Sequence, residues 1–225
     1  MPPATVLPMA VVQDAQDART VASATRGQRL PRRERRAQLL DAAREVFVAQ
    51  GYHAAAMDDI AEAAGVSKPV LYQHFPGKLE LYLALLDASS DALIAAVEEA
   101  LEQTSDNKLR VQATVQAYFD FVDDPGGAFR LIFESDLTNE SAVRERVDRT
   151  NDACAALVSK VIAEDTGLTE AEALLLAAGL TGQAQTAARR WLRDGSDIPK
   201  ADAAALVSIL SWRGISRIPL SHPPV

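Results

Sequence analysis

The chain has almost no cysteine. Cys154 is the single one among 225 residues, so no disulfide can form within the chain. Disulfide frameworks are typical of small secreted domains, whereas a lone thiol suits a reducing compartment. We therefore expect a cytoplasmic protein. We interpret Cys154 as a buried small hydrophobic residue, because a redox sensor needs a basic neighbourhood or a partner thiol.

The chain also lacks a long hydrophobic run. A helix that spans a bilayer needs about 20 consecutive apolar residues, and no stretch reaches that length. Residues 4–12 are mostly apolar, but no positive charge precedes them, as a signal peptide requires. The sequence predicts no membrane partner. Residues 1–28, rich in alanine, proline and polar side chains, are expected to form a disordered tail.

Patterns for catalysis and metal binding are missing as well. The histidines His53, His74 and His222 have no spacing suited to a metal site. The chain contains no glycine-rich phosphate loop and no serine–histidine–aspartate or paired-carboxylate pattern. We expect no enzymatic activity, no catalytic residue, no metal and no cofactor.

Positive charge is scarce overall, with a formal net charge of −8, which at first argues against a nucleic-acid partner. The distribution of charge reverses that conclusion. Residues 1–78 carry ten basic and eight acidic side chains, and the remainder carries thirteen basic and twenty-three acidic ones. DNA binding needs local neutralisation of phosphates rather than a basic whole protein. The N-terminal third is therefore the candidate DNA-binding region.

Apolar side chains recur at helical spacing along most of the chain, and no convincing strand is found. The sequence predicts an all-α fold of about nine helices. Gly51 should end the first helix, and Thr169 with Glu172 should form a capping box at the eighth. The predicted helices cover 35–50, 57–64, 68–75, 78–103, 108–123, 128–135, 140–164, 169–193 and 200–213.

The first three helices have the spacing of a helix-turn-helix unit, with Gly65-Val66-Ser67 as the turn. In such units the second helix of the motif enters the major groove of DNA. Ser67 is expected to cap that helix and Pro69 to lie in its first turn. Leu71 and Phe75, four residues apart, should point inward, which leaves Tyr72 outward.

The residue types of this region suit DNA contacts. Amide, hydroxyl and ammonium groups can hydrogen-bond bases or phosphates, and small apolar groups can contact a thymine methyl. The arginines that open the first helix are expected to contact phosphates. The predicted DNA-binding residues are Arg32, Arg33, Arg36, Ser67, Lys68, Pro69, Val70, Tyr72, Gln73, His74 and Lys78.

The stretch GYHAAAMDDIAEAAGVSKPVLYQHFPGKLELYLALL closely resembles the DNA-binding motif of the TetR family, and the resemblance spans residues 35–86. It implies that Lys68, Pro69, Val70, Tyr72 and Gln73 face the groove and that Tyr72, His74 and Lys78 contact phosphates. The family usually has threonine or serine just before the second helix, where this chain has Ala55 and Ala56. We expect Asp58 to supply the missing cap.

The segments LPRRERRAQLL, AYFDFVDD, FRLIFESDL and WL…IPK resemble TetR-family regulators of actinobacterial fatty-acid-synthase genes. That resemblance implies a homodimer on palindromic double-stranded DNA. It also implies that the effector is a long-chain acyl-CoA, or a related fatty-acyl lipid, which releases the protein from DNA. Small residues along 171–188, together with the apolar helix at 203–212, suit the close packing of a dimer interface.

An apolar effector is expected in a cavity between the helices of the second domain. The predicted lining is Val97, Leu101, Val115, Tyr118, Phe119, Phe133, Leu157 and Leu180. A CoA head group needs cations, and the candidates for that role are Arg130, Arg144, Arg189 and Arg190.

The predicted organisation is a tail at 1–28, a helix-turn-helix domain at 29–78, an effector and dimerisation domain at 79–217, and a C-terminal tail at 218–225. Two alternatives stay open. One is a TetR-type repressor of an efflux or catabolic operon that senses another lipophile. The other is a helical enzyme or acyl-CoA-binding module without a DNA role, which leaves the helix-turn-helix pattern unexplained.

Overall fold

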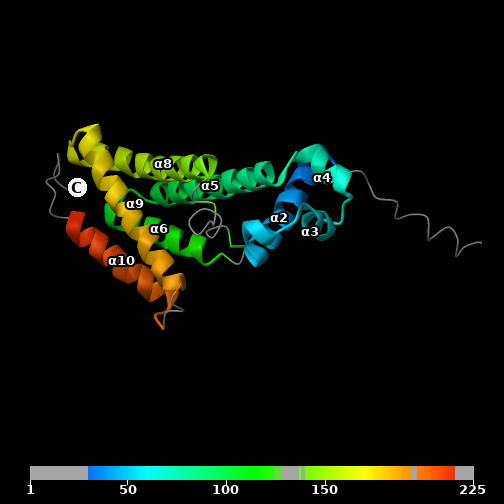
Figure 1. The fold of residues 1–225 in the computed structure, drawn as a ribbon. Coiled ribbons are helices and arrows are strands. Elements are labelled where there is room, and N and C mark those ends of the chain that lie inside the picture. The colour runs from blue at the N-terminus through cyan, green and yellow to red at the C-terminus, as the bar shows by residue number, and fades with distance from the viewer. Residues whose placement is uncertain (1–29, 125, 128–136, 138–139, 194–196, 216–225) are drawn as a thin grey trace, which may run out of the picture. The chain divides into compact units, whose positions relative to one another are not determined.

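The computed structural model describes residues 30–124, 126–127, 137, 140–193 and 197–215, and within them the chain is all-helical (Figure 1). The all-α prediction is confirmed. The predicted helix at 128–135 and both predicted tails lie outside the described residues. The described helices are α2 (Arg32–Ala54), α3 (Met57–Ala63), α4 (Lys68–His74), α5 (Lys78–Glu102), α6 (Asn107–Val122), α8 (Ser141–Thr166), α9 (Glu170–Arg193) and α10 (Lys200–Ile215).

Helix α2 is interrupted at Gly51, where the sequence predicted its end, but the chain returns to a helical conformation after this residue. Gly51 has φ 77° and ψ 163°, a conformation that a residue with a side chain rarely adopts, and one further turn follows to Ala54. The helix also begins at Arg32, earlier than predicted. Contacts divide the chain into two units, Met1–Arg36 and Ala37–Val225.

A first hydrophobic core joins α2, α3, α4 and the beginning of α5. Leu39, Ile60, Leu71 and Leu86 are fully buried in it. The helices α3 and α4 are seven residues each, too short to be stable alone, so this shared core holds them in place.

A second core is formed by α5, α6, α8, α9 and α10, which pack on one another as a bundle. Phe119 and Cys154 are buried at its centre, and burial raises the pKa of the Cys154 thiol. A buried protonated thiol matches the predicted small hydrophobic residue. On α9, alanines such as Ala177 and Ala184 face this core and allow neighbouring helices to approach closely.

Helix α5 belongs to both cores. Leu81 and Leu86 lie in the first core, whereas Leu93 and Val97 lie in the second. One uninterrupted helix of 25 residues therefore connects the two sets of packed side chains. The domain boundary at 78/79 stays a prediction.

The predicted capping box of α9 is present. The backbone N–H of Thr169 donates to Glu172 Oε2 at 2.9 Å, and the Glu172 N–H reaches Thr169 Oγ1 at 3.4 Å. These two bonds satisfy donors that a helix start otherwise leaves unpaired. Among the described residues, no helix is both long and apolar enough to cross a membrane.

Candidate nucleic-acid interface and effector cavity

The turn between α3 and α4 has the tight geometry of a helix-turn-helix motif. Gly65 takes the left-handed conformation, with φ 63°, and its N–H donates to the Glu62 carbonyl at 2.9 Å. The Val66 N–H donates to the Ala61 carbonyl, also at 2.9 Å. These bonds close α3 and set the direction in which α4 begins.

Helix α4 has one buried and one exposed face. Leu71 and Phe75 are buried in the first core, and Tyr72 is 48% exposed, so the predicted orientation of this helix is confirmed. Such an exposed tyrosine beside exposed polar groups can meet a groove without unfolding any part of the core. Further predicted contact residues lie on this helix or at its N-cap: Ser67, Lys68, Pro69 and Gln73 are exposed, and Val70 is half-buried.

Two predicted caps differ in the structure. Ser67 occupies the N-cap position of α4, but its side chain makes no capping hydrogen bond. Asp58 does not cap α3. The neighbouring Asp59 accepts from the Ala56 N–H at 3.4 Å instead, and Asp58 pairs with Lys68. The carboxylate of Asp58 is therefore drawn towards the nearest cation rather than towards the helix start.

Lys68 and Lys78 have different surroundings. Lys68 pairs with Asp58 at the surface. Both side chains are well exposed, so separating the pair costs little free energy. Lys78 is half-buried, and its ammonium donates to the carbonyls of Tyr52 at 2.8 Å and Ala55 at 2.9 Å. It also lies 4.5 Å from the centre of the Tyr52 ring.

Lys78 thus connects the end of α2 to the start of α5 through hydrogen bonds. Its position in the sequence does not reveal this role. A third, longer bond to the His53 carbonyl, at 3.4 Å, takes up its remaining donor capacity. A phosphate contact by Lys78 stays a prediction, and it has to compete with these carbonyls. The other predicted residues lie at the surface or near it: Arg32, Arg33 and Arg36 are exposed on the first turns of α2, and His74 is half-buried.

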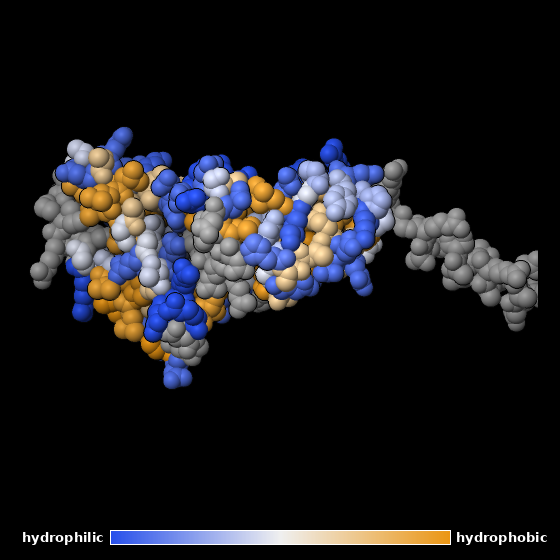
Figure 2. Space-filling model, in the orientation of Figure 1, coloured by the Kyte–Doolittle hydropathy of each residue, from blue (hydrophilic) through white to orange (hydrophobic). Residues whose placement is uncertain are grey.

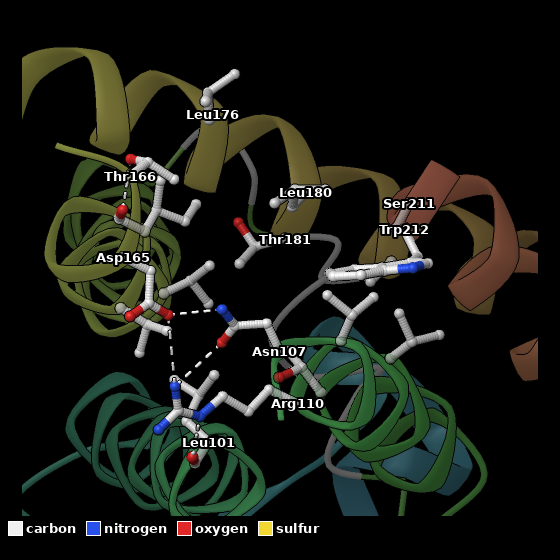
Figure 3. A pocket seen from close by; sticks show the side chains of 17 residues that line it. Leu101, Asn107, Arg110, Asp165, Thr166, Leu176, Leu180, Thr181, Ser211 and Trp212 are labelled. Atoms are coloured by element: carbon white, nitrogen blue, oxygen red, sulfur yellow. Dashed lines mark hydrogen bonds and ion pairs between the residues drawn. The ribbon is translucent and has the colours of Figure 1, made fainter. Parts of the chain in front are cut away.

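A cavity of about 190 Å³ opens within the second core. Its walls come from the end of α5, the first half of α6, the second half of α8, and the facing sides of α9 and α10 (Figure 3). Most of the lining is aliphatic, including Val158, Ile162 and Leu176. An apolar space of this kind favours a hydrocarbon ligand.

Only part of the predicted lining surrounds this cavity. Leu101, Val115 and Leu180 line it, as predicted. Val97, Tyr118, Phe119 and Leu157 pack in the second core but do not reach the cavity wall. Burial raises the pKa of the Tyr118 phenol well above its usual range, and the adjacent Cys154 raises it further. The remaining predicted residue, Phe133, lies outside the described residues.

One end of the cavity is polar. Asn107 Nδ2 donates to Asp165 Oδ2 at 2.6 Å, and Arg110 Nη1 donates to Asn107 Oδ1 at 3.1 Å. Arg110 also lies 3.8 Å from Asp165. Figure 3 shows this group on one side of the view and the indole of Trp212 across from it.

Among the described residues, the cation that lines this cavity is Arg110, which was not one of the predicted cations. The predicted cations Arg144, Arg189 and Arg190 do not line the cavity, and Arg130 lies outside the described residues. The available clue is that Arg110 and Thr114 are one turn apart and adjoin the inward-facing Val111 and Val115. Polar residues at such positions border the apolar face of a helix.

Comparison with known proteins gives consistent matches. The profile of the bacterial regulatory proteins of the tetR family matches residues 39–85. The chain is 48% identical to the HTH-type transcriptional activator FasR of Mycolicibacterium smegmatis over 197 residues, which is 88% of this chain and 90% of that protein.

Solved structures share the fold. A TetR-like transcriptional regulator from Rhodococcus sp. RHA1 superposes with a TM-score of 0.63 at 27% identity, over 84% of this chain and 100% of that chain. The transcriptional regulator FadR from Bacillus subtilis, solved in complex with stearoyl-CoA, superposes with a TM-score of 0.66 at 20% identity, over 78% of this chain and 96% of that chain.

Proposed function

Because the chain belongs to the TetR family of bacterial regulatory proteins, we propose that it regulates fatty-acid biosynthesis genes and that a long-chain acyl-CoA releases it from DNA. The chain is a DNA-binding transcriptional regulator. The observation that carries the finer proposal is the 48% identity to FasR, which extends over 88% of this chain and 90% of that protein.

DNA binding is assigned to the exposed face of α4. Tyr72 and Gln73 lie on this face, and Lys68 lies at the beginning of the helix. The amide of Gln73 is of the type that recognises adenine in the major groove, and the ammonium of Lys68 can neutralise a phosphate. A single short helix binds weakly, so two copies on a palindromic operator supply the affinity.

The dimer is assigned to α9 and α10. Leu175 on α9 is 75% exposed, and Leu206 and Leu210 on α10 are 60% and 64% exposed. Figure 2 shows hydrophobic side chains gathered over these two helices. Because soluble monomers rarely expose such patches, a second copy of the chain is the proposed partner for this face.

The cavity supports a lipophilic effector. Each buried methylene of an acyl chain contributes about 0.8 kcal/mol. The volume of about 190 Å³ is smaller than the roughly 300–1,000 Å³ of typical ligand pockets, so a long chain has to push the helices apart. Leu101 lines the cavity at the end of α5, a rigid helix roughly 38 Å long, so expansion there changes the position of its other end.

The proposal is tested by titrating lipid-free protein on fluorescent operator DNA with an acyl-CoA series. Palmitoyl-CoA and stearoyl-CoA are expected to release the DNA at micromolar concentrations, whereas CoA alone and acetyl-CoA are not, because they bury no chain. Equal release by CoA and palmitoyl-CoA, or release by neither, contradicts the proposal.

The small volume of the cavity also favours one second candidate, a regulator of an efflux or catabolic operon that senses a compact lipophile. Such a ligand fits without expansion of the helices. The same titration with compact aromatic drugs separates the two candidates, since the second predicts DNA release by these and not by palmitoyl-CoA.

A further inference from the structure

Thr114 on α6 stands out among the buried hydroxyl groups. Within the described residues, its Oγ1 is the buried side-chain oxygen or nitrogen that has no hydrogen-bond partner. The residue is 9% exposed and lines the cavity. A buried hydroxyl without a partner is costly, so its presence in a native fold calls for an explanation.

Other threonine hydroxyls within helices of this chain form a local hydrogen bond that Thr114 does not form. Thr150, Thr166 and Thr181 each donate to the carbonyl four residues earlier, at 2.8, 2.6 and 3.0 Å. This local bond is the usual solution for threonine inside a helix. Thr181 lines the same cavity, so cavity walls do not in themselves prevent the bond. The Thr114 hydroxyl therefore has no hydrogen bond within the described fold that a ligand would have to displace.

We infer that the Thr114 hydroxyl donates a hydrogen bond to the carbonyl oxygen of an acyl ligand, and thereby selects acyl compounds over plain hydrocarbons. The inference rests on the proposed function and adds a specificity-determining residue to it. A hydroxyl can donate to a thioester or carboxyl oxygen, and a methylene chain offers no acceptor.

The surroundings of Thr114 give the ligand a direction. Arg110 lies one helical turn before Thr114 on α6, within the polar group that it forms with Asn107 and Asp165. A ligand carbonyl at Thr114 therefore has polar partners on the side of its head group. Its chain extends along the aliphatic walls towards Trp212, which lies across the cavity in Figure 3.

The test compares two ligands that differ only at the carbonyl, palmitoyl-CoA and its thioether S-hexadecyl-CoA, on lipid-free full-length protein. Wild type is expected to bind palmitoyl-CoA roughly threefold to tenfold more tightly than the thioether, the effect of one hydrogen bond. Thr114→Val should abolish this preference, and Thr114→Ser should restore it. Thr181→Val, the matched control, should keep it. Palmitic acid, as a third ligand, shows whether a carboxyl serves as well as a thioester.

Stability provides an independent readout. Without ligand, Thr114→Val should melt at or above the temperature of wild type, because it removes an unpaired buried hydroxyl of nearly the same shape. A lower melting temperature would mean that the hydroxyl has a partner in the fold and would overturn the inference. So would the same ligand preference in Thr114→Val and wild type. If wild type bound none of the three ligands, the proposed function would fall together with the inference.

Discussion

At the scale of single residues, Lys68 and Lys78 carry the same charge but are expected to have different roles, Lys68 in DNA binding and Lys78 in stability. Lys68 is exposed at the beginning of α4, and among the described residues it pairs with Asp58. The DNA affinity falls as the salt concentration rises. Lys68→Ala is expected to make the slope of log affinity against log salt less steep by about one unit, because one phosphate contact is lost. Asp58→Asn, the matched change, should raise DNA affinity by freeing the ammonium. An unchanged salt slope in Lys68→Ala excludes the phosphate contact.

Lys78 is expected to act on stability. Lys78→Met removes bonds to the carbonyls of Tyr52 and Ala55, and leaves those acceptors without their cation. The free energy of unfolding should fall by about 1–3 kcal/mol, which is several degrees in Tm. Lys68→Met, measured by the same thermal denaturation, should leave Tm nearly unchanged. A Lys78→Met variant that melts like wild type but loses salt sensitivity would instead place Lys78 on DNA.

These residues also mark how far sequence reasoning reaches. The outward direction of Tyr72 follows from the four-residue spacing of Leu71 and Phe75, a local property of the helix. The hydrogen-bond partners of Lys78 do not follow from local spacing, because the carbonyls that Lys78 binds lie more than twenty residues earlier in the chain. Local periodicity determines which way a side chain points, and tertiary contacts determine what it meets.

At the scale of elements, the capping box of α9 is a sequence motif whose contribution can be measured. Thr169→Ala removes the hydroxyl bonds to Glu172 and should cost about 1 kcal/mol of stability. Ser159→Ala, on α8, is the control, since its hydroxyl donates to the Ala156 carbonyl of its own helix. A Thr169→Ala variant as stable as wild type at neutral pH contradicts the motif.

The same capping box predicts a pH dependence. Hydrogen bonds from Thr169 lower the pKa of the Glu172 carboxyl below its ordinary value of 4.5. A lowered folded-state pKa stabilises the chain at pH values above 4.5, and that stabilisation is lost as the pH falls through the lowered value. The difference in Tm between wild type and Thr169→Ala should therefore narrow in acid. A constant difference from pH 7 to pH 3 argues against the carboxylate as the partner.

The elements themselves were largely predictable. The boundaries of α3, α4, α5 and α6 agree with the predicted helices to within about one residue, because glycine, proline and the helical period coincide at their ends. Gly51 was recognised as a breaker, but the extra turn to Ala54 was not, since that turn is held by contacts from α5. The cavity lining was only partly predicted, because it depends on which faces of five helices meet.

At the scale of the whole molecule, operator binding depends on pairing of two chains. Leu206 and Leu210 lie four residues apart on α10 and present an exposed apolar stripe. The double variant Leu206→Glu/Leu210→Glu should be monomeric in light scattering and bind operator about a hundredfold more weakly, because the charges cannot be desolvated at the interface. Leu109→Glu, at an exposed leucine on α6, should remain dimeric. A dimeric double variant removes α10 from the interface.

Coupling between the cavity and DNA belongs to the same scale, and Leu101 is the residue at which to test it. Its side chain lines the cavity, and its helix, α5, continues into the core that supports α4. Leu101→Phe fills part of the available volume at an expected cost of about 1–3 kcal/mol in stability. Since the acyl chain then competes with the ring, DNA release should need at least tenfold more palmitoyl-CoA, while operator affinity without effector stays the same.

Leu109→Phe, which adds the same ring outside the cavity, should respond to palmitoyl-CoA as wild type does. If Leu101→Phe also released DNA at the wild-type concentration of palmitoyl-CoA, the effector would have to bind elsewhere. If it lost operator affinity in the absence of any effector, the ring itself would be shifting α5. In that case occupation of the cavity, rather than the chemistry of the ligand, would be sufficient to move α4 away from its DNA-binding position.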